Sequence, residues 1–401
     1  MAGTEIVITD NVAVGGGTVG RLADGRACFV DDALVGERVS VEITEDRGRF
    51  VRSRVLEVID ASPHRVTPPC PAVARGCGGC DLQHADLGEQ HRMKAAAVAD
   101  AWERIGRIPR PGVAVIGLPA LDYRTTVRLA VDGDRVGFRA ARSHDVVPVD
   151  TCPVAHQMID GLIAHGRFDG CDEVTIRVGA RTGDAMVVAA STAAGVSVPD
   201  NVIAVGADEL AAGRRAWIHE EVAGRRWRIS AGSFFQTRPD GADALVAEVR
   251  GAVERLAGRP TRLVDLCSGV GLFAGTVAAD EVVAVEQSRS SCADARVNLA
   301  DLGDAATVFE LSLRSWRPSP ADVVIADPSR DGLGKVGVQR VTDTGAPLVV
   351  LVSCDAGSGA RDAGLLVAAG YHPESVTVVD LFPHTHHVEV VSVFVRTLSR
   401  G

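Results

Sequence analysis

The sequence predicts an α/β protein with three parts: an N-terminal β-barrel, a β-rich central domain and a C-terminal Rossmann-like domain. Its 401 residues exceed what one hydrophobic core usually organises. From residue 245 onward, wholly apolar strands alternate with helical segments, as in a parallel sheet covered on both faces. Before that point, short alternating runs broken by glycine indicate small β domains. We expect domains at residues 1–60, 61–230 and 231–401.

Composition excludes several classes of protein. The chain is 46% hydrophobic and 23% charged, which rules out a largely disordered chain. No apolar run approaches the roughly 18 residues that a bilayer-spanning helix needs, so we expect no membrane partner. The start, MAGTEIVITD, lacks a basic and then apolar leader, which predicts a cytoplasmic protein. Nine cysteines without an export signal favour metal or thiolate chemistry over a disulfide framework.

Residues 4–60 contain period-2 runs separated by glycine and aspartate, which predict a small antiparallel barrel. Arg47, Arg49, Arg52 and Arg54 alternate along its last run, and we expect all four to project from one face. They suit either a solvated edge strand or a stripe that contacts phosphates. The net charge of −10 does not decide between these, because global charge governs solubility more than local binding.

A proline-rich linker at residues 61–71 leads into a cysteine cluster. Cys70, Cys77 and Cys80 form the pattern C-x6-C-x2-C, and Cys152 follows later. Four thiolates can bind a [4Fe–4S] cluster or tetrahedral zinc. Zinc sites generally favour two close pairs, whereas three cysteines lie together here and one lies far away, which better fits a cubane cluster. We interpret three other cysteines as ordinary small apolar residues, namely Cys28, Cys171 and Cys292.

The middle of the chain combines one long helix with short strands. An amphipathic helix is expected from about residue 88 to 105, in a position to pack on the C-terminal domain. Short β-like segments between residues 113 and 229 predict the rest of an irregular β-rich domain.

A glycine turn follows the first strand of the C-terminal region, in the motif DLCSGVG. Gly269 and Gly271 let the backbone approach a ligand closely, and we expect a helix to begin behind them. Glu286 ends the next strand, where a carboxylate can accept both ribose hydroxyls of an adenosine. No third glycine continues the pyrophosphate-binding pattern, so S-adenosylmethionine suits the site better than a dinucleotide. The alternative is that Glu286 only caps its strand.

Two later segments carry candidate reactive groups. The apolar strand PLVVLVS ends at Cys354, where amide donors and a helix N-terminus can stabilise a thiolate, although most cysteines are inert buried residues. Near the C-terminus, FPHTHHVE places Glu389 beside His384, His386 and His387. Three histidines are compatible with a metal site, but their close spacing favours a loop that positions one carboxylate.

Together these motifs resemble the RNA uracil-5-methyltransferase family. Its members are class I S-adenosylmethionine-dependent enzymes with a TRAM domain, an OB-like barrel module, and an iron–sulfur cluster. The stretch GGGTVGRLADGRACFVDDALVGERVSVEI resembles the TRAM domain, and the cysteine set follows it. The other matches are GSFFQTR at 232–238, DLCSGVG at 265–271, ADPSRDGL at 326–333, VSCDAGSGARD at 352–362 and FPHTHHVE at 382–389. The resemblance spans nearly the whole chain.

The resemblance implies roles for particular residues. Carbon 5 of uracil is a poor nucleophile, but a thiolate that adds to carbon 6 activates it, and Cys354 matches this nucleophile. Glu389 matches the base that then removes the proton from carbon 5. The target base must leave its stack, and Phe234 and Phe235 are candidates for its pocket unless they pack in the core. The family's cofactor contacts fall on Gln236, Cys267, Glu286 and Asp327, and its cluster ligands on Cys70, Cys77, Cys80 and Cys152.

Some positions depart from the family pattern. Cys267 and Ser268 stand where an aromatic residue and cysteine are usual, Ser329 replaces a proline, and Asp355-Ala356 replaces Asn-Pro. The nucleophile and base remain, so we expect a monomeric enzyme that methylates carbon 5 of a uridine in structured RNA, either 23S rRNA or tRNA, and does not act on DNA. One alternative is a non-catalytic RNA-binding or chaperone protein on a degenerate scaffold. Another is a methyltransferase acting on small molecules or proteins.

Overall fold

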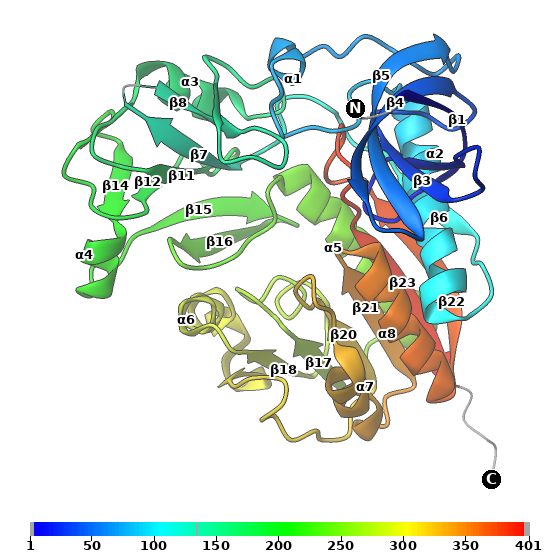
Figure 1. Cartoon of the computed structure of the whole chain (residues 1–401). Coiled ribbons are helices and arrows are strands. Elements are labelled where there is room, and N and C mark those ends of the chain that lie inside the picture. The colour runs from blue at the N-terminus through cyan, green and yellow to red at the C-terminus, as the bar shows by residue number, and fades with distance from the viewer. Residues whose placement is uncertain (1–3, 134, 397–401) are drawn as a thin grey trace.

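The computed structural model describes residues 4–133 and 135–396. The first three residues of the range 1–60 and the last five of 231–401 lie outside this part of the chain. Figure 1 shows the barrel and the central sheet drawn above the C-terminal domain. No helix within the described ranges combines the length and apolarity needed to cross a bilayer.

Five strands form a closed N-terminal barrel in the order β1-β2-β3-β5-β4. Their bounds are β1 (Thr4–Val12), β2 (Thr18–Arg21), β3 (Ala27–Asp31), β4 (Arg38–Asp46) and β5 (Phe50–Asp60). Alternate residues such as Val39, Val41 and Val51 fill its interior, as the period-2 pattern predicts. The barrel is confirmed, but one pair, β3 with β5, is parallel and closes it.

The four barrel arginines do not share one face, so that expectation is wrong. Arg52 and Arg54 project from β5 into solvent, whereas Arg47 and Arg49 lie in the preceding turn. Successive side chains of a strand point to opposite faces, so the odd positions 47 and 49 could not share a face with the even positions 52 and 54. Arg54 also pairs with Glu42 on the neighbouring strand at 2.7 Å.

The central part contains a six-stranded sheet in the order β14-β12-β11-β7-β8-β9. Its strands are β7 (Thr126–Asp132), β8 (Arg135–Arg139), β9 (Val146–Pro148), β11 (Glu173–Val178), β12 (Ala185–Ala189) and β14 (Val202–Gly206). Smaller elements surround it: α1 (Pro71–Ala74), α3 (Gln157–His165), α4 (Ala207–Ala211), β10 (Arg167–Phe168), β13 (Val196–Ser197), and the hairpin β15 (Trp217–Val222) and β16 (Arg225–Ser230). The core of this part includes Leu129, Ile159 and Ile176.

The C-terminal domain is an eight-stranded sheet in the order β19-β18-β17-β20-β21-β23-β22-β6. Its strands are β6 (Val113–Ile116), β17 (Arg262–Leu266), β18 (Glu281–Glu286), β19 (Ala306–Glu310), β20 (Val323–Ala326), β21 (Leu348–Ser353), β22 (Tyr371–Val379) and β23 (Val390–Arg396). Its helices are α5 (Pro239–Ala257), α6 (Arg289–Asn298), α7 (Gly334–Asp343) and α8 (Ala356–Ala368), with a 3-10 turn at η2 (Ala300–Ala305). Neighbouring strand residues such as Leu263 and Val264 belong to different hydrophobic clusters, so both faces are covered. This confirms the Rossmann-like prediction.

One segment within residues 61–230 packs on the C-terminal domain. Helix α2 (Leu87–Ala101) continues into a π-helical turn, η1 (Trp102–Gly106), where Trp102 stacks on Phe394 of β23 at 6.0 Å between ring centroids. Strand β6 then pairs in parallel with β22 and forms the edge of the C-terminal sheet. Residues 87–116 therefore pack on the C-terminal domain before the chain enters the central sheet.

Candidate active site

The glycine turn after β17 contains backbone conformations that favour close approach by a ligand. Cys267, Gly269 and Gly271 all have positive φ angles of 60°, 54° and 92°. A side chain in this region is unusual and marks a constrained site when the residue is not glycine. Residues 270–277 form successive turns rather than the regular helix that we expected behind the glycines.

Glu286, at the end of β18, holds this turn in place. Its Oε2 accepts a hydrogen bond from the Gly269 amide at 3.0 Å, and its Oε1 accepts one from the Ser288 amide at 2.7 Å. The carboxylate is half-buried and keeps lone pairs free for further donors. It therefore has the position and capacity to accept ribose hydroxyls.

Two polar atoms beside the turn are buried and have no hydrogen-bond partner among the described residues: Asp265 Oδ1 and Ser268 Oγ. Unsatisfied buried groups are rare, and a bound ligand is one explanation for them. Burial raises the pKa of Asp265 to about 8 and that of Asp327 to about 7, with Glu286 adding to both shifts. An acidic cluster with free acceptors fits the cationic sulfonium and ammonium groups of S-adenosylmethionine. The sequence prediction missed Asp265 and Ser268, although both lie in the DLCSGVG motif.

The GSFFQTR segment lies between β16 and α5. Ser233 anchors it by donating a hydrogen bond from Oγ to Asp294 Oδ2 at 2.6 Å. Gln236 and Phe235 are buried, whereas Phe234 is 64% exposed. The phenylalanine pair is therefore divided between the core and the surface.

Cys354 directly follows β21 and Glu389 directly precedes β23, at the same end of two neighbouring strands. Ser353 of β21 pairs with Val390 of β23 in an antiparallel ladder. Cys354 and Glu389 flank this last pair, and the Glu389 carboxylate is close enough to help raise the pKa of the Cys354 thiol. Asp327 follows the next strand, β20, and its amide donates to the Leu266 carbonyl at 3.1 Å. The predicted nucleophile and base are thus adjacent to a third carboxyl group.

Burial controls the protonation of this group of residues. It raises the pKa of Cys354 to about 11, and the carboxylates of Glu389 and Asp327 add to the shift. The expected stabilisation of the thiolate at the helix N-terminus is therefore outweighed. Burial also raises the pKa of Glu389 well above its usual value, and Asp327 contributes further.

Cys354 lines a pocket whose walls come from distant parts of the chain. The barrel loop at residues 12–16, helix α2 and the C-terminal loop all contribute to it. Arg330 and His387 line it as well. Burial lowers the pKa of His387 to about 4, so this imidazole is neutral at physiological pH.

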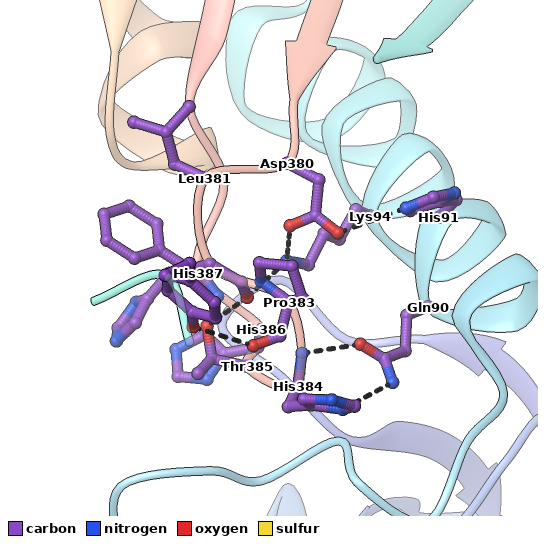
Figure 2. A network of polar contacts seen from close by, with 12 residues as sticks. Gln90, His91, Lys94, Asp380, Leu381, Pro383, His384, Thr385, His386 and His387 are labelled. Atoms are coloured by element: carbon purple, nitrogen blue, oxygen red, sulfur yellow. Dashed lines mark hydrogen bonds and ion pairs between the residues drawn. The ribbon is translucent and has the colours of Figure 1, made fainter. Parts of the chain in front are cut away.

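Helix α2 holds the loop that leads to Glu389 (Figure 2). Lys94 Nζ donates to Asp380 Oδ1 at 2.5 Å and to the Phe382 carbonyl at 2.9 Å. Gln90 accepts from the His384 amide at 2.7 Å, and its Nε2 lies 3.2 Å from His384 Nδ1. These contacts fix both ends of the turn before the predicted base. His384 is thus hydrogen-bonded to helix α2 within the loop that precedes Glu389.

The four predicted ligand cysteines, Cys70, Cys77, Cys80 and Cys152, line one cavity. Gly78 permits the close approach of this segment to the central sheet, because an added Cβ would lie 3.0 Å from the Arg139 carbonyl oxygen. Within the part of the chain that is described, no three His, Cys, Asp or Glu side chains are grouped as they would be around one metal ion. Four thiols around a shared cavity fit a multi-iron cluster in their donor chemistry.

The fold and the site define a methyltransferase that uses S-adenosylmethionine. A TRAM-domain family model matches residues 7–56, which confirms the barrel assignment. An uncharacterised RNA methyltransferase of Streptomyces avermitilis is 33% identical, covering 95% of this chain and 96% of the relative. The 23S rRNA (uracil(1939)-C(5))-methyltransferase of Shewanella halifaxensis is 30% identical, covering 92% and 91%.

A solved structure shares the fold of almost the whole chain. The tRNA (uracil-54, C5)-methyltransferase of Pyrococcus abyssi, in complex with S-adenosyl-L-homocysteine, superposes with a TM-score of 0.75. It is 24% identical, with coverage of 97% of this chain and 99% of that one. The solved structure shows the shared fold, and the relatives above show the family. The chain belongs to the RNA uracil-C5 methyltransferases.

Proposed function

We propose that this enzyme transfers a methyl group to carbon 5 of a uridine in RNA through a covalent bond between Cys354 and the uracil ring. The observation that supports the proposal is that Cys354 directly follows β21 and Glu389 directly precedes β23 at the same end of this antiparallel pair, where the Glu389 carboxylate helps to raise the Cys354 pKa. A nucleophile and a base must both reach the same ring, on adjacent carbons.

The steps follow from the chemistry of the two side chains. Cys354 Sγ reacts as the thiolate, after its proton has passed to water, and its bond to carbon 6 shifts the ring π electrons so that carbon 5 becomes nucleophilic. S-adenosylmethionine supplies the electrophilic methyl group, which carbon 5 accepts. S-adenosylhomocysteine is the leaving group of this transfer. Glu389 then takes the proton from carbon 5, the electron pair of that C–H bond re-forms the carbon 5–carbon 6 double bond, and the Sγ–carbon 6 bond breaks to release the Cys354 thiolate. A carboxylate with a raised pKa is a stronger base for this proton than an ordinary glutamate.

Gln236, Cys267, Gly269, Gly271, Glu286 and Asp327 form our proposed cofactor site. The unpartnered oxygens of Asp265 and Ser268 support this assignment, since both atoms lie beside the same turn. Glu286 would hold the ribose while the acidic groups attract the cationic end of the cofactor.

The proposed substrate is structured RNA, and 23S rRNA is favoured over tRNA. Two relatives that align over more than nine-tenths of this chain, at 30% and 31% identity, are 23S rRNA uracil-C5 enzymes. The TRAM barrel contributes exposed arginines, including Arg52, which suit phosphate contacts. The target uridine must turn out of its stack to reach Cys354.

We further propose that Cys70, Cys77, Cys80 and Cys152 bind a [4Fe–4S] cluster. Their shared cavity supports this, and the cluster would link the segment after the linker to the central sheet. No step of the methyl transfer needs a redox change.

Mapping of 5-methyluridine in total RNA tests the proposed function. A strain that lacks the gene should lose 5-methyluridine at one or a few positions, and the wild-type gene should restore it. Cys354→Ala should not restore it, whereas the matched variant Cys171→Ala, at a cysteine buried in the central core, should. An unchanged RNA profile in the deletion strain would favour a non-catalytic RNA-binding protein or a methyltransferase for other substrates.

A further inference from the structure

A loop of the N-terminal barrel forms part of the pocket around Cys354. Val12, the last residue of β1, and Ala13 to Gly16, between β1 and β2, line the same pocket as Cys354. The barrel is therefore more than a separate RNA-binding module, because it borders the reacting atoms.

Gly16 lies in close contact with His386 of the C-terminal domain, which leaves no room for a side chain at this position. Its φ is +98°, and an added Cβ would lie 3.0 Å from both Cβ and Cγ of His386. Such a distance is tighter than normal packing, so the barrel loop rests directly against this histidine. A side chain at Gly16 must displace either the loop or His386.

His386 is itself firmly held. Its amide donates to Asp81 Oδ1 at 2.9 Å, and its Nδ1 contacts Asp81 Oδ2. The amides of Asp81 and Leu82 also donate to the His384 carbonyl, at 3.1 and 2.9 Å. The surface on which the barrel loop rests is thus fixed by the segment that follows Cys80, so the loop position is defined relative to Glu389.

The pocket chemistry suits one nucleotide. The barrel loop supplies apolar side chains at Val12, Ala13 and Val14, while exposed Arg330 contributes a cation on the catalytic domain. Apolar surfaces accept the face of a base that has left its stack, and arginine binds phosphate. Both kinds of surface meet beside the thiol.

We propose that the loop Val12–Gly16 contacts the RNA at the target uridine and determines which uridine is accepted. This inference rests on the proposed function, because it places the target base at Cys354. It assigns the barrel a role in site selection within the pocket, in addition to any contact that its outer arginines make with phosphates.

Photocross-linking tests the contact directly. A synthetic RNA carries 5-fluorouridine at the mapped target and 4-thiouridine at the adjacent nucleotides, and the full-length enzyme with S-adenosylmethionine is trapped on it. After irradiation, mass spectrometry should find cross-linked peptides that contain residues 12–16. Cross-links confined to other segments, with the Cys354 adduct present, overturn the inference. Absence of the adduct overturns the proposed function instead, and the inference falls with it.

A pair of glycine variants tests the role in selection. Gly16→Ala should lower kcat/KM for RNA about tenfold, because small displacements of positioning groups have large effects. It should also raise methylation of other uridines relative to the target, while S-adenosylmethionine affinity stays unchanged. The matched control is Gly25→Ala, which has a similar φ of +85° but no atom within 4 Å of the added Cβ and no place in the pocket. Equal kcat/KM and equal selectivity for the two variants would refute the role.

Discussion

Removal of one member of the buried pair between α2 and the Glu389 loop should destabilise the protein strongly. The side chains of Lys94 and Asp380 are 1% and 0% exposed, and Nζ lies 2.5 Å from Oδ1. Asp380→Asn leaves the ammonium group with one strong partner, the Phe382 carbonyl. An uncompensated buried charge of this kind costs about 3–5 kcal/mol. That is a large part of a typical unfolding free energy of roughly 5–15 kcal/mol.

The measurement is urea unfolding followed by tryptophan fluorescence, since Trp102 and Trp316 are buried in the C-terminal core. A matched control is the exposed pair Arg259 and Asp280, 2.8 Å apart, where Arg259→Met should cost less than about 1 kcal/mol. The double variant Lys94→Met with Asp380→Leu should recover much of the loss, because an apolar pair carries no unpaired charge.

Two results would refute this reasoning. One is a cost for Asp380→Asn as small as that for Arg259→Met. The other is a double variant that is no more stable than Asp380→Asn, which would show that the unpaired ammonium group is not the source of the cost.

Three further predictions concern the reacting groups and the cysteines. Glu389→Gln should allow methylation but not release, so a covalent RNA–protein complex should accumulate on denaturing gels and turnover should fall by about 10²–10⁴; turnover near the wild-type rate would contradict this. Because burial raises the pKa of Glu389 and the base must be deprotonated to release the product, kcat should rise as pH increases above neutrality. A flat profile between pH 6 and 9 would show that no group with a raised pKa limits the reaction. Cys80→Ser should lose iron in anaerobic preparations, whereas Cys292→Ser, at a buried cysteine outside the cavity, should keep it; stoichiometric zinc in the wild type would contradict a cubane cluster.

Local sequence patterns were sufficient for most of the fold. The wholly apolar strand that ends at Ser353 and the period-2 runs of the barrel each carry their own periodicity. Strand β6 could not be assigned in this way, because VAVI is short and its partner β22 lies some 260 residues later. The prediction for the barrel arginines failed for a simpler reason, since Arg47 and Arg49 lie in the turn around Gly48, before β5 begins at Phe50.

The candidate site, too, could be predicted from the sequence only in part. Cys354 and Glu389 stand at strand ends, where sheet topology and the family resemblance both point. The ion pair of Lys94 and Asp380 joins positions 286 residues apart, and no local pattern signals it. The direction of the Cys354 pKa shift also depends on burial and on two carboxylates from other strands. Contacts between residues so far apart in the sequence can be identified only from the folded structure.

The covalent bond at Cys354 is tested most directly by mass spectrometry of enzyme trapped on RNA. With S-adenosylmethionine and RNA that carries 5-fluorouridine, no proton can be removed from carbon 5, so the adduct should persist. After nuclease and protease digestion, the account predicts a methylated fluorouridine nucleotide on the peptide that contains Cys354, and none with Cys354→Ala. A trapped nucleotide on another residue, or methylated RNA with no adduct at all, would contradict it.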